Sequence, residues 1–293
     1  MRNMIFSTPI STQLAKKIAS AAGTTSGHAE FRSFADGERY VRVLSNVRGR
    51  SVVALGSTPP PAENWIDLLF LIRALKENGA RRVTAVLPYL GYGRGDHVEK
   101  KGEMIALRLV ANLLESAGAS RVIVVDPHAA EISRFFRVPA SAVSILDGLL
   151  SKIEAGADLL TVAPDRGAAE RAGRAARILG TNQVVVFKKI RPRPNVVRLL
   201  PGKVIRGTKS AIIVDDMIDT GGTVVAAIRR LRASGVRNIT VAATHGILSR
   251  DAAKKIRLAG AASVIVSDTL PVTESQKRLL KIVGTAEAIV RVL

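Results

Sequence analysis

The chain has 293 residues, with 44 Lys+Arg, 24 Asp+Glu and no cysteine, which gives a formal net charge of +20 at pH 7. The lack of cysteine excludes a disulfide-stabilised scaffold, a thiolate metal site and a cysteine nucleophile. The longest uncharged run, residues 3–15, is shorter than the ~20 residues that cross a bilayer, so we expect a soluble, cytoplasmic protein, and the length favours about two domains.

Helical segments alternate with short β-branched runs, and this alternation predicts an α/β fold of parallel-rich sheets flanked by helices. At four places a helical segment ends in glycine and an apolar run follows, beginning with Gly79, Gly118, Gly235 and Gly260. Glycine suits this position because it adopts the left-handed conformation without strain. Two such series lie on either side of residues 140–151, so we expect one domain over 1–145 and a second over 146–283.

Helical spacing of apolar residues predicts which helix faces are buried. Ile105, Leu109 and Leu113 follow one another four residues apart, so we expect them to form the buried stripe of one helix. The same argument predicts a buried stripe on a helix that includes residues 224–231.

Residues 188–209 interrupt the alternation. The segment 188–195 (KKIRPRPN) cannot be the interior of a helix, because each proline lacks an N–H donor and restricts the residue before it. We expect an exposed hairpin or flap that carries at least four positive charges. A solvated turn without a function is the alternative.

The strongest chemical signal lies at residues 211–223 (AIIVDDMIDTGGT), where an apolar strand is followed by two carboxylates, a glycine-containing turn and a helix. Ligands of open α/β sheets bind beyond the carboxyl ends of the strands, and the N–H groups at a helix N-terminus bind phosphate. Asp215 and Asp216 would repel a phosphate, but they can accept hydrogen bonds from sugar hydroxyls or bind a cation. The run therefore predicts a sugar-phosphate site, with an acidic N-terminal cap as the alternative.

This run resembles the ribose-phosphate signature of type I phosphoribosyltransferases. Further motifs extend the resemblance to ribose-phosphate pyrophosphokinases over nearly the whole chain: residues 34–38 (FADGE), 88–94 (PYLGYGR), 126–129 (DPHA), 164–167 (PDRG), 191–195 (RPRPN) and 243–245 (ATH). The resemblance implies two similar phosphoribosyltransferase-like domains, with residues 284–293 returning to the first. It also implies a homo-oligomer that converts ATP and ribose 5-phosphate into phosphoribosyl pyrophosphate (PRPP) and AMP, with Mg²⁺ as cofactor.

Site residues follow from the resemblance, position by position. It assigns Lys189 and Arg191 to a mobile catalytic flap, where their charges neutralise the transferring diphosphoryl group. His128 and Asp165, which each follow a short apolar run and so are expected at strand ends, match the metal positions. The matching ATP contacts are Phe34, Asp36, Glu38, Arg94 and Asp96. The diphosphate loop matches Ser57 and Thr58. The ribose 5-phosphate site matches Asp215, Asp216, Asp219, Thr220, Gly221, Gly222 and Thr223.

The sequence also departs from the family pattern. Gly95 stands where glutamine is usual, His97 replaces a basic residue, and Ala168 replaces a glycine of the sugar-binding turn. Residues 100–103 (KKGE) resemble the shorter, archaeal-type branch, which leaves ATP and ADP both open as the nucleotide.

These departures keep other interpretations open. One is a non-catalytic homologue that binds nucleotides and regulates a true synthetase, and another is a base-transferring phosphoribosyltransferase. Nucleic-acid binding through the +20 charge is the weakest, because the 4% aromatic content argues against a base-stacking surface.

Overall fold

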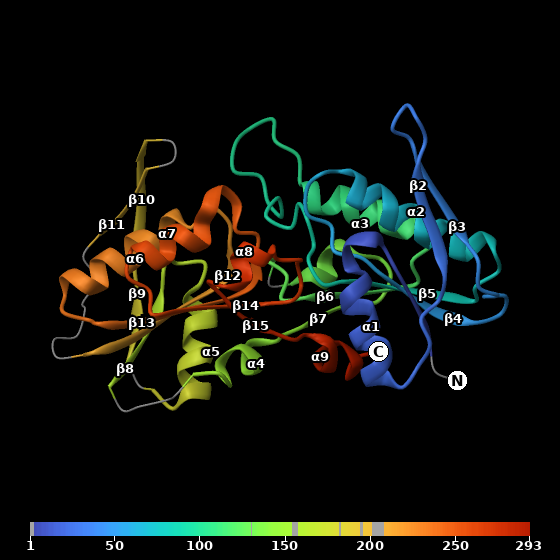
Figure 1. The fold of residues 1–293 in the computed structure, drawn as a ribbon. Coiled ribbons are helices and arrows are strands. Elements are labelled where there is room, and N and C mark those ends of the chain that lie inside the picture. The colour runs from blue at the N-terminus through green and yellow to red at the C-terminus, as the bar shows by residue number, and fades with distance from the viewer. Residues whose placement is uncertain (1–2, 130, 154–157, 182, 194–195, 201–207) are drawn as a thin grey trace. The chain divides into compact units, whose positions relative to one another are not determined.

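The β-branched runs of the sequence form the strands of two parallel sheets, each in its own compact unit of the computed structural model (Figure 1). Unit 1 consists of Met1–Ser144, Thr269–Pro271 and Thr285–Leu293, and unit 2 consists of Ile145–Asp268 and Val272–Gly284. The structure describes residues 3–129, 131–153, 158–181, 183–193, 196–200 and 208–293. The predicted α/β fold with parallel-rich sheets is confirmed.

Unit 1 contains a five-stranded sheet in the order β1-β4-β5-β6-β7, with every pair parallel. Its strands are β1 (Met4–Ser7), β4 (Ser51–Leu55), β5 (Arg82–Leu87), β6 (Arg121–Val125) and β7 (Ala140–Val143). An antiparallel hairpin consists of β2 (Ala29–Ser33) and β3 (Arg39–Val43). The helices are α1 (Thr12–Ala22), α2 (Glu63–Glu77), α3 (Ala106–Ala117) and α9 (Ala286–Val290), with 3-10 turns η1 (Pro9–Ser11) and η2 (Ile132–Phe135).

Unit 2 contains a six-stranded parallel sheet in the order β15-β14-β13-β12-β8-β9. Its strands are β8 (Leu159–Ala163), β9 (Val184–Val186), β12 (Ser210–Ile218), β13 (Asn238–Gly246), β14 (Ser263–Ser267) and β15 (Lys281–Val283). The helices are α4 (Leu146–Leu150), α5 (Ala169–Leu179), α6 (Gly222–Ala233), α7 (Ala252–Leu258) and α8 (Glu274–Lys277), with the 3-10 turn η3 (Ser249–Asp251).

The hairpin that the prolines predict after residue 188 is present. β10 (Lys188–Arg193) pairs antiparallel with β11 (Val196–Leu200), and the register shifts between Ile190 and Arg193. Lys189 and Arg191 therefore lie on the first strand of this hairpin. Pro194 and Asn195, which belong to the motif that suggested it, lie outside the described residues.

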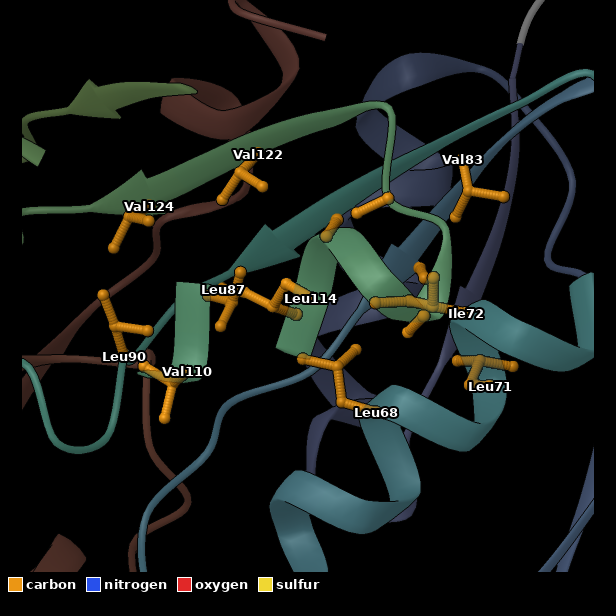
Figure 2. Close-up of a cluster of buried hydrophobic side chains, with 14 of the residues drawn as sticks. Leu68, Leu71, Ile72, Val83, Leu87, Leu90, Val110, Leu114, Val122 and Val124 are labelled. Atoms are coloured by element: carbon orange, nitrogen blue, oxygen red, sulfur yellow. The ribbon is translucent and has the colours of Figure 1, made fainter. Parts of the chain in front are cut away.

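The apolar core of unit 1 lies between its sheet and the helices α2 and α3. Figure 2 shows Leu68 and Ile72 of α2 and Leu114 of α3 among the side chains of β5 and β6. The four predicted glycine junctions are confirmed, since Gly79, Gly118, Gly235 and Gly260 all have positive φ. Within the part of the chain that the structure describes, no helix is long and apolar enough to span a bilayer.

The prediction of which face of α3 is buried is wrong, because the buried face is rotated by part of a turn from the predicted one. Leu109 and Leu113 are 48% and 41% exposed, whereas Leu107, Val110 and Leu114 are buried. Both stripes have helical spacing and both contain leucine, so periodicity alone does not separate them. The stripe at residues 224–231 is confirmed by the complete burial of Ile228 and Leu231.

Candidate functional site

The strand β12 continues through the two carboxylates that the sequence places after it. Asp215 still pairs with Ala243 of β13, and the pairing continues to Ile218. On the other side, pairing with β8 stops at Ile213. The prediction of an apolar strand that ends before the carboxylates is therefore wrong, because β12 runs through them to Ile218, although its ladder with β8 ends before them.

Three acidic side chains come close together at this end of the sheet in unit 2. Asp165 follows β8 by two residues and accepts a hydrogen bond from Gly167 N at 3.0 Å, while Asp216 N donates to Asp215 Oδ1 at 2.9 Å. Burial, together with the negative charges of Asp216 and Asp165, raises the pKa of Asp215 well above its usual range. This cluster favours a ligand that brings hydroxyl donors or a cation.

The turn after β12 leads directly into helix α6. Gly221 has φ +75° and precedes the helix, which begins at Gly222, and Thr223 is its second residue. No side-chain hydrogen bond caps this N-terminus in the described structure. The N–H groups of the first turn therefore suit an anionic ligand. Thr220 is exposed and Thr223 is half-buried, so both hydroxyls lie on the surface of the same turn.

A serine from the segment after β13 forms a hydrogen bond with Asp219, the third acidic residue of the motif. Ser249 Oγ donates to Asp219 Oδ1 at 2.5 Å, and Ser249 begins the 3-10 turn η3. The two residues are 30 positions apart, and no local motif in the sequence signals the contact. The structure thus places Asp215, Asp216, Asp219 and the start of α6 around one turn.

In unit 1, the predicted ATP contacts Phe34, Asp36 and Glu38 lie at the tip of the β2–β3 hairpin. Phe34 N donates to Glu38 O at 2.9 Å, and Asp36 Oδ1 accepts from Glu38 N at 3.0 Å, so the tip is a closed turn. Phe34 is 45% exposed, and its ring meets Tyr40 edge-on at 5.9 Å. The Arg32 guanidinium lies 4.2 Å from the Tyr40 ring centroid and 5.1 Å from that of Phe34. The tip therefore carries a partly exposed aromatic ring beside a guanidinium.

A largely buried ion pair joins this hairpin to helix α2. Arg39 Nε and Nη2 donate to the two carboxylate oxygens of Asp67 at 2.8 and 2.7 Å, and Arg39 Nη1 donates to Ser33 Oγ at 2.6 Å. The Asp67 side chain is only 5% exposed. Because Arg39 directly follows the tip, this ion pair holds the tip in one orientation relative to helix α2.

We expect Asp67→Asn to lower the free energy of unfolding by about 3 kcal/mol, because it leaves a largely buried guanidinium without its counter-charge. Urea unfolding followed by circular dichroism measures this loss. Glu77→Gln is the matched control, since Arg73 and Glu77 form a 2.7 Å pair on the same helix but are 59% and 62% exposed. The control should change stability by no more than ~0.5 kcal/mol. Equal effects of the two substitutions would contradict the role given to Asp67.

Segment 88–97 carries the other predicted ATP contacts. Arg94 is exposed, and Asp96 Oδ1 lies 2.6 Å from His97 Nδ1. The hydrogen bond to Asp96 and the charge of that carboxylate raise the pKa of His97. A Cβ on Gly95 would lie 2.9 Å from the Ala106 Cβ, which is too close. A larger residue at position 95 would therefore require the start of α3 to shift.

Ser57 and Thr58 are almost completely buried. Ser57 N donates to Ser11 Oγ at 2.9 Å and Thr58 N to Tyr89 O at 3.0 Å. The Ser57 hydroxyl donates to Thr269 O at 2.6 Å. Their donors are therefore bonded within the protein, and a diphosphate would have to displace these bonds in order to use them. Their role remains a prediction.

The two predicted metal ligands belong to different units. His128 is exposed in the turn after β6, in unit 1, and Asp165 is half-buried after β8, in unit 2. Among the residues that the structure describes, no group of three or more His, Cys, Asp or Glu side chains could hold a metal ion. Each of these side chains by itself could serve as one of the one or two protein ligands that Mg²⁺ usually takes, with the other ligands coming from substrate phosphates and water.

Comparison with known proteins covers both units. The family described as "N-terminal domain of ribose phosphate pyrophosphokinase" matches residues 3–118, and the "Phosphoribosyl synthetase-associated domain" matches residues 174–292. The ribose-phosphate pyrophosphokinase of Chlorobaculum tepidum is 40% identical over 264 residues, which cover 88% of this chain and 80% of that protein. That of Methanothermobacter thermautotrophicus is 39% identical over 267 residues, which cover 91% and 93%.

A solved structure agrees with these matches. The crystal structure of phosphoribosylpyrophosphate synthetase from Mycobacterium smegmatis matches with a TM-score of 0.91 at 34% identity, covering 100% of this chain and 97% of that one. Bacterial and archaeal relatives match at nearly the same identity, so the resemblance to the archaeal-type branch remains a prediction.

Proposed function

The chain belongs to the ribose-phosphate pyrophosphokinase family, and we propose that it transfers the β,γ-diphosphoryl group of ATP to the anomeric hydroxyl of ribose 5-phosphate, giving PRPP and AMP. The relatives support an enzyme of diphosphoryl transfer over both units of the chain. The observation that carries the assignment is local: a half-buried carboxylate cluster lies beside an uncapped helix N-terminus in unit 2.

The two halves of that site suit the two ends of a pentose phosphate. The 5-phosphate is bound by the first N–H groups of α6 and by the hydroxyls of Thr220 and Thr223. Asp215 and Asp216 accept hydrogen bonds from the ribose hydroxyls. The raised pKa of Asp215 supports this assignment, because hydroxyl donors relieve the repulsion between neighbouring carboxylates.

The chemical step forms a bond between the anomeric oxygen and the β-phosphorus, and it breaks the bond from that phosphorus to the oxygen bridging to the α-phosphorus. The electron pair of the broken bond leaves on AMP, and the hydroxyl proton is released to solvent. Such a step depends on positioning and on charge stabilisation, since the protein forms no covalent intermediate. We assign the stabilising charges to Lys189 and Arg191 of the β10–β11 hairpin.

ATP is bound through unit 1. Phe34 stacks on the base, with Asp36 and Glu38 near its amino group, while Arg94 and Asp96 contact the rest of the nucleotide. Ser57 and Thr58 lie at the diphosphate. His128 and Asp165 would each offer a ligand to Mg²⁺, and the ion would supply positive charge at the phosphates.

The exposed tip at residues 34–38 fits the family's homo-oligomeric arrangement, in which a neighbouring subunit supplies this loop. We include such assembly in the proposal. A cytoplasmic location belongs to it as well, since both substrates are phosphorylated metabolites.

The test is PRPP formation by the purified chain. We expect AMP release from ATP that depends on both Mg²⁺ and ribose 5-phosphate, with PRPP identified by mass spectrometry. ADP and other nucleotides are assayed in parallel, with and without inorganic phosphate. No PRPP from any nucleoside triphosphate or from ADP would overturn the proposal, and nucleotide binding without turnover would favour the regulatory homologue instead.

A further inference from the structure

The segment after β13 has an unusual backbone. Leu248, Arg250 and Asp251 have φ values of +56°, +51° and +58°, and none of them is glycine. A side chain with a Cβ is strained in this left-handed conformation. Strain of this kind persists only where surrounding contacts hold it, and it concentrates at functional sites. The contacts of this segment therefore indicate what the strain achieves.

The segment contacts the turn between β12 and α6 at successive positions. Leu248 N donates to Ile218 O at 2.9 Å, and Ser249 Oγ donates to Asp219 Oδ1 at 2.5 Å. Beyond these, a Cβ on Gly221 would lie 3.2 Å from the Ala252 Cβ at the start of α7. A backbone hydrogen bond, a side-chain hydrogen bond and close packing therefore all hold this turn against the segment after β13.

We propose that Ser249 is a positioning residue for ribose 5-phosphate, acting through Asp219; this inference rests on the proposed function. Asp219 carries a negative charge in a turn that must accept a phosphate, so an unrestrained carboxylate would repel the ligand. The hydrogen bond from Ser249 holds the carboxylate in one orientation and offsets part of its charge. The strained backbone brings the serine to Asp219.

Ser249→Ala should raise KM for ribose 5-phosphate about tenfold, which corresponds to ~1.4 kcal/mol, and should leave KM for ATP and kcat within twofold. Ser249→Thr keeps a hydroxyl and should restore most of the lost affinity. Ser234→Ala is the matched control, because the Ser234 hydroxyl donates to Arg230 O at 3.2 Å just after the opposite end of α6. It should leave both KM values unchanged.

A double-mutant cycle separates positioning from simple stabilisation. In an Asp219→Ala background, Ser249→Ala should have no further effect on KM for ribose 5-phosphate, because its partner is gone. An unchanged KM in Ser249→Ala, or an equal rise in both KM values together with a lower melting temperature, would overturn the inference. If the wild-type chain forms no PRPP, the proposed function fails. Calorimetric titration of ribose 5-phosphate into wild type and Ser249→Ala then tests the inference by itself, and equal affinities would overturn it.

Discussion

Replacement of Lys189 by alanine is expected to lower kcat about a thousandfold, with both KM values changed by no more than a few fold. The reason is that the negative charge of the diphosphoryl group spreads over its oxygens only during transfer, so a cation placed there stabilises the transition state more than the bound substrates. Steady-state assay of AMP release at saturating ATP and ribose 5-phosphate measures the effect. Arg191→Ala should behave in the same way.

The hairpin offers a matched control for this prediction. Lys188 carries the same charge, is exposed and adjoins Lys189 on β10, so Lys188→Ala removes one positive charge from the same strand. We expect its kcat to stay within threefold of wild type. Turnover that survives Lys189→Ala would remove the assignment of this residue to the reacting phosphates.

Gly91→Ala is expected to lower the free energy of unfolding by about 2–3 kcal/mol and to raise KM for ATP. A Cβ at this position would lie 2.0 Å from the Thr58 carbonyl oxygen, and Gly91 N donates to Thr58 Oγ1 at 2.9 Å in the buried interior. The clash must push segment 88–97 away from residues 57–58, which moves Arg94 and Asp96 together. Urea unfolding and ATP-dependence of the rate measure the two consequences.

A glycine-to-alanine substitution elsewhere in the chain should have the opposite effect on the free energy of unfolding. Gly173 lies inside helix α5, and nothing is within 4 Å of a Cβ placed on it. Gly173→Ala should therefore stabilise the protein by about 0.5–1 kcal/mol, since alanine loses less backbone freedom in a helix. If Gly91→Ala proved as harmless as Gly173→Ala, the close packing of these two segments would not be a requirement of the fold.

Several features could be predicted from the sequence because their causes are local. Glycine after a helix, prolines in a hairpin and β-branched runs between helices each depend on the conformational preferences of a few neighbouring residues. Periodicity was less decisive: on α3 both stripes are apolar, and only the packing of Leu107 and Leu114 against the sheet selects one. The extension of β12 past Asp215 likewise depends on pairing with β13, which lies far along the chain.

The amino-acid sequence by itself determined the α/β class, the hairpin after residue 188 and the motif that combines carboxylates with a helix N-terminus, since each follows from short-range preferences and spacing. Only the tertiary structure decided which side chains restrain that motif. The pairs Arg39–Asp67 and Ser249–Asp219 join residues 28 and 30 positions apart, and neither has a local signature. Such contacts arise when separate elements pack, because burial brings distant polar groups together and requires them to find partners.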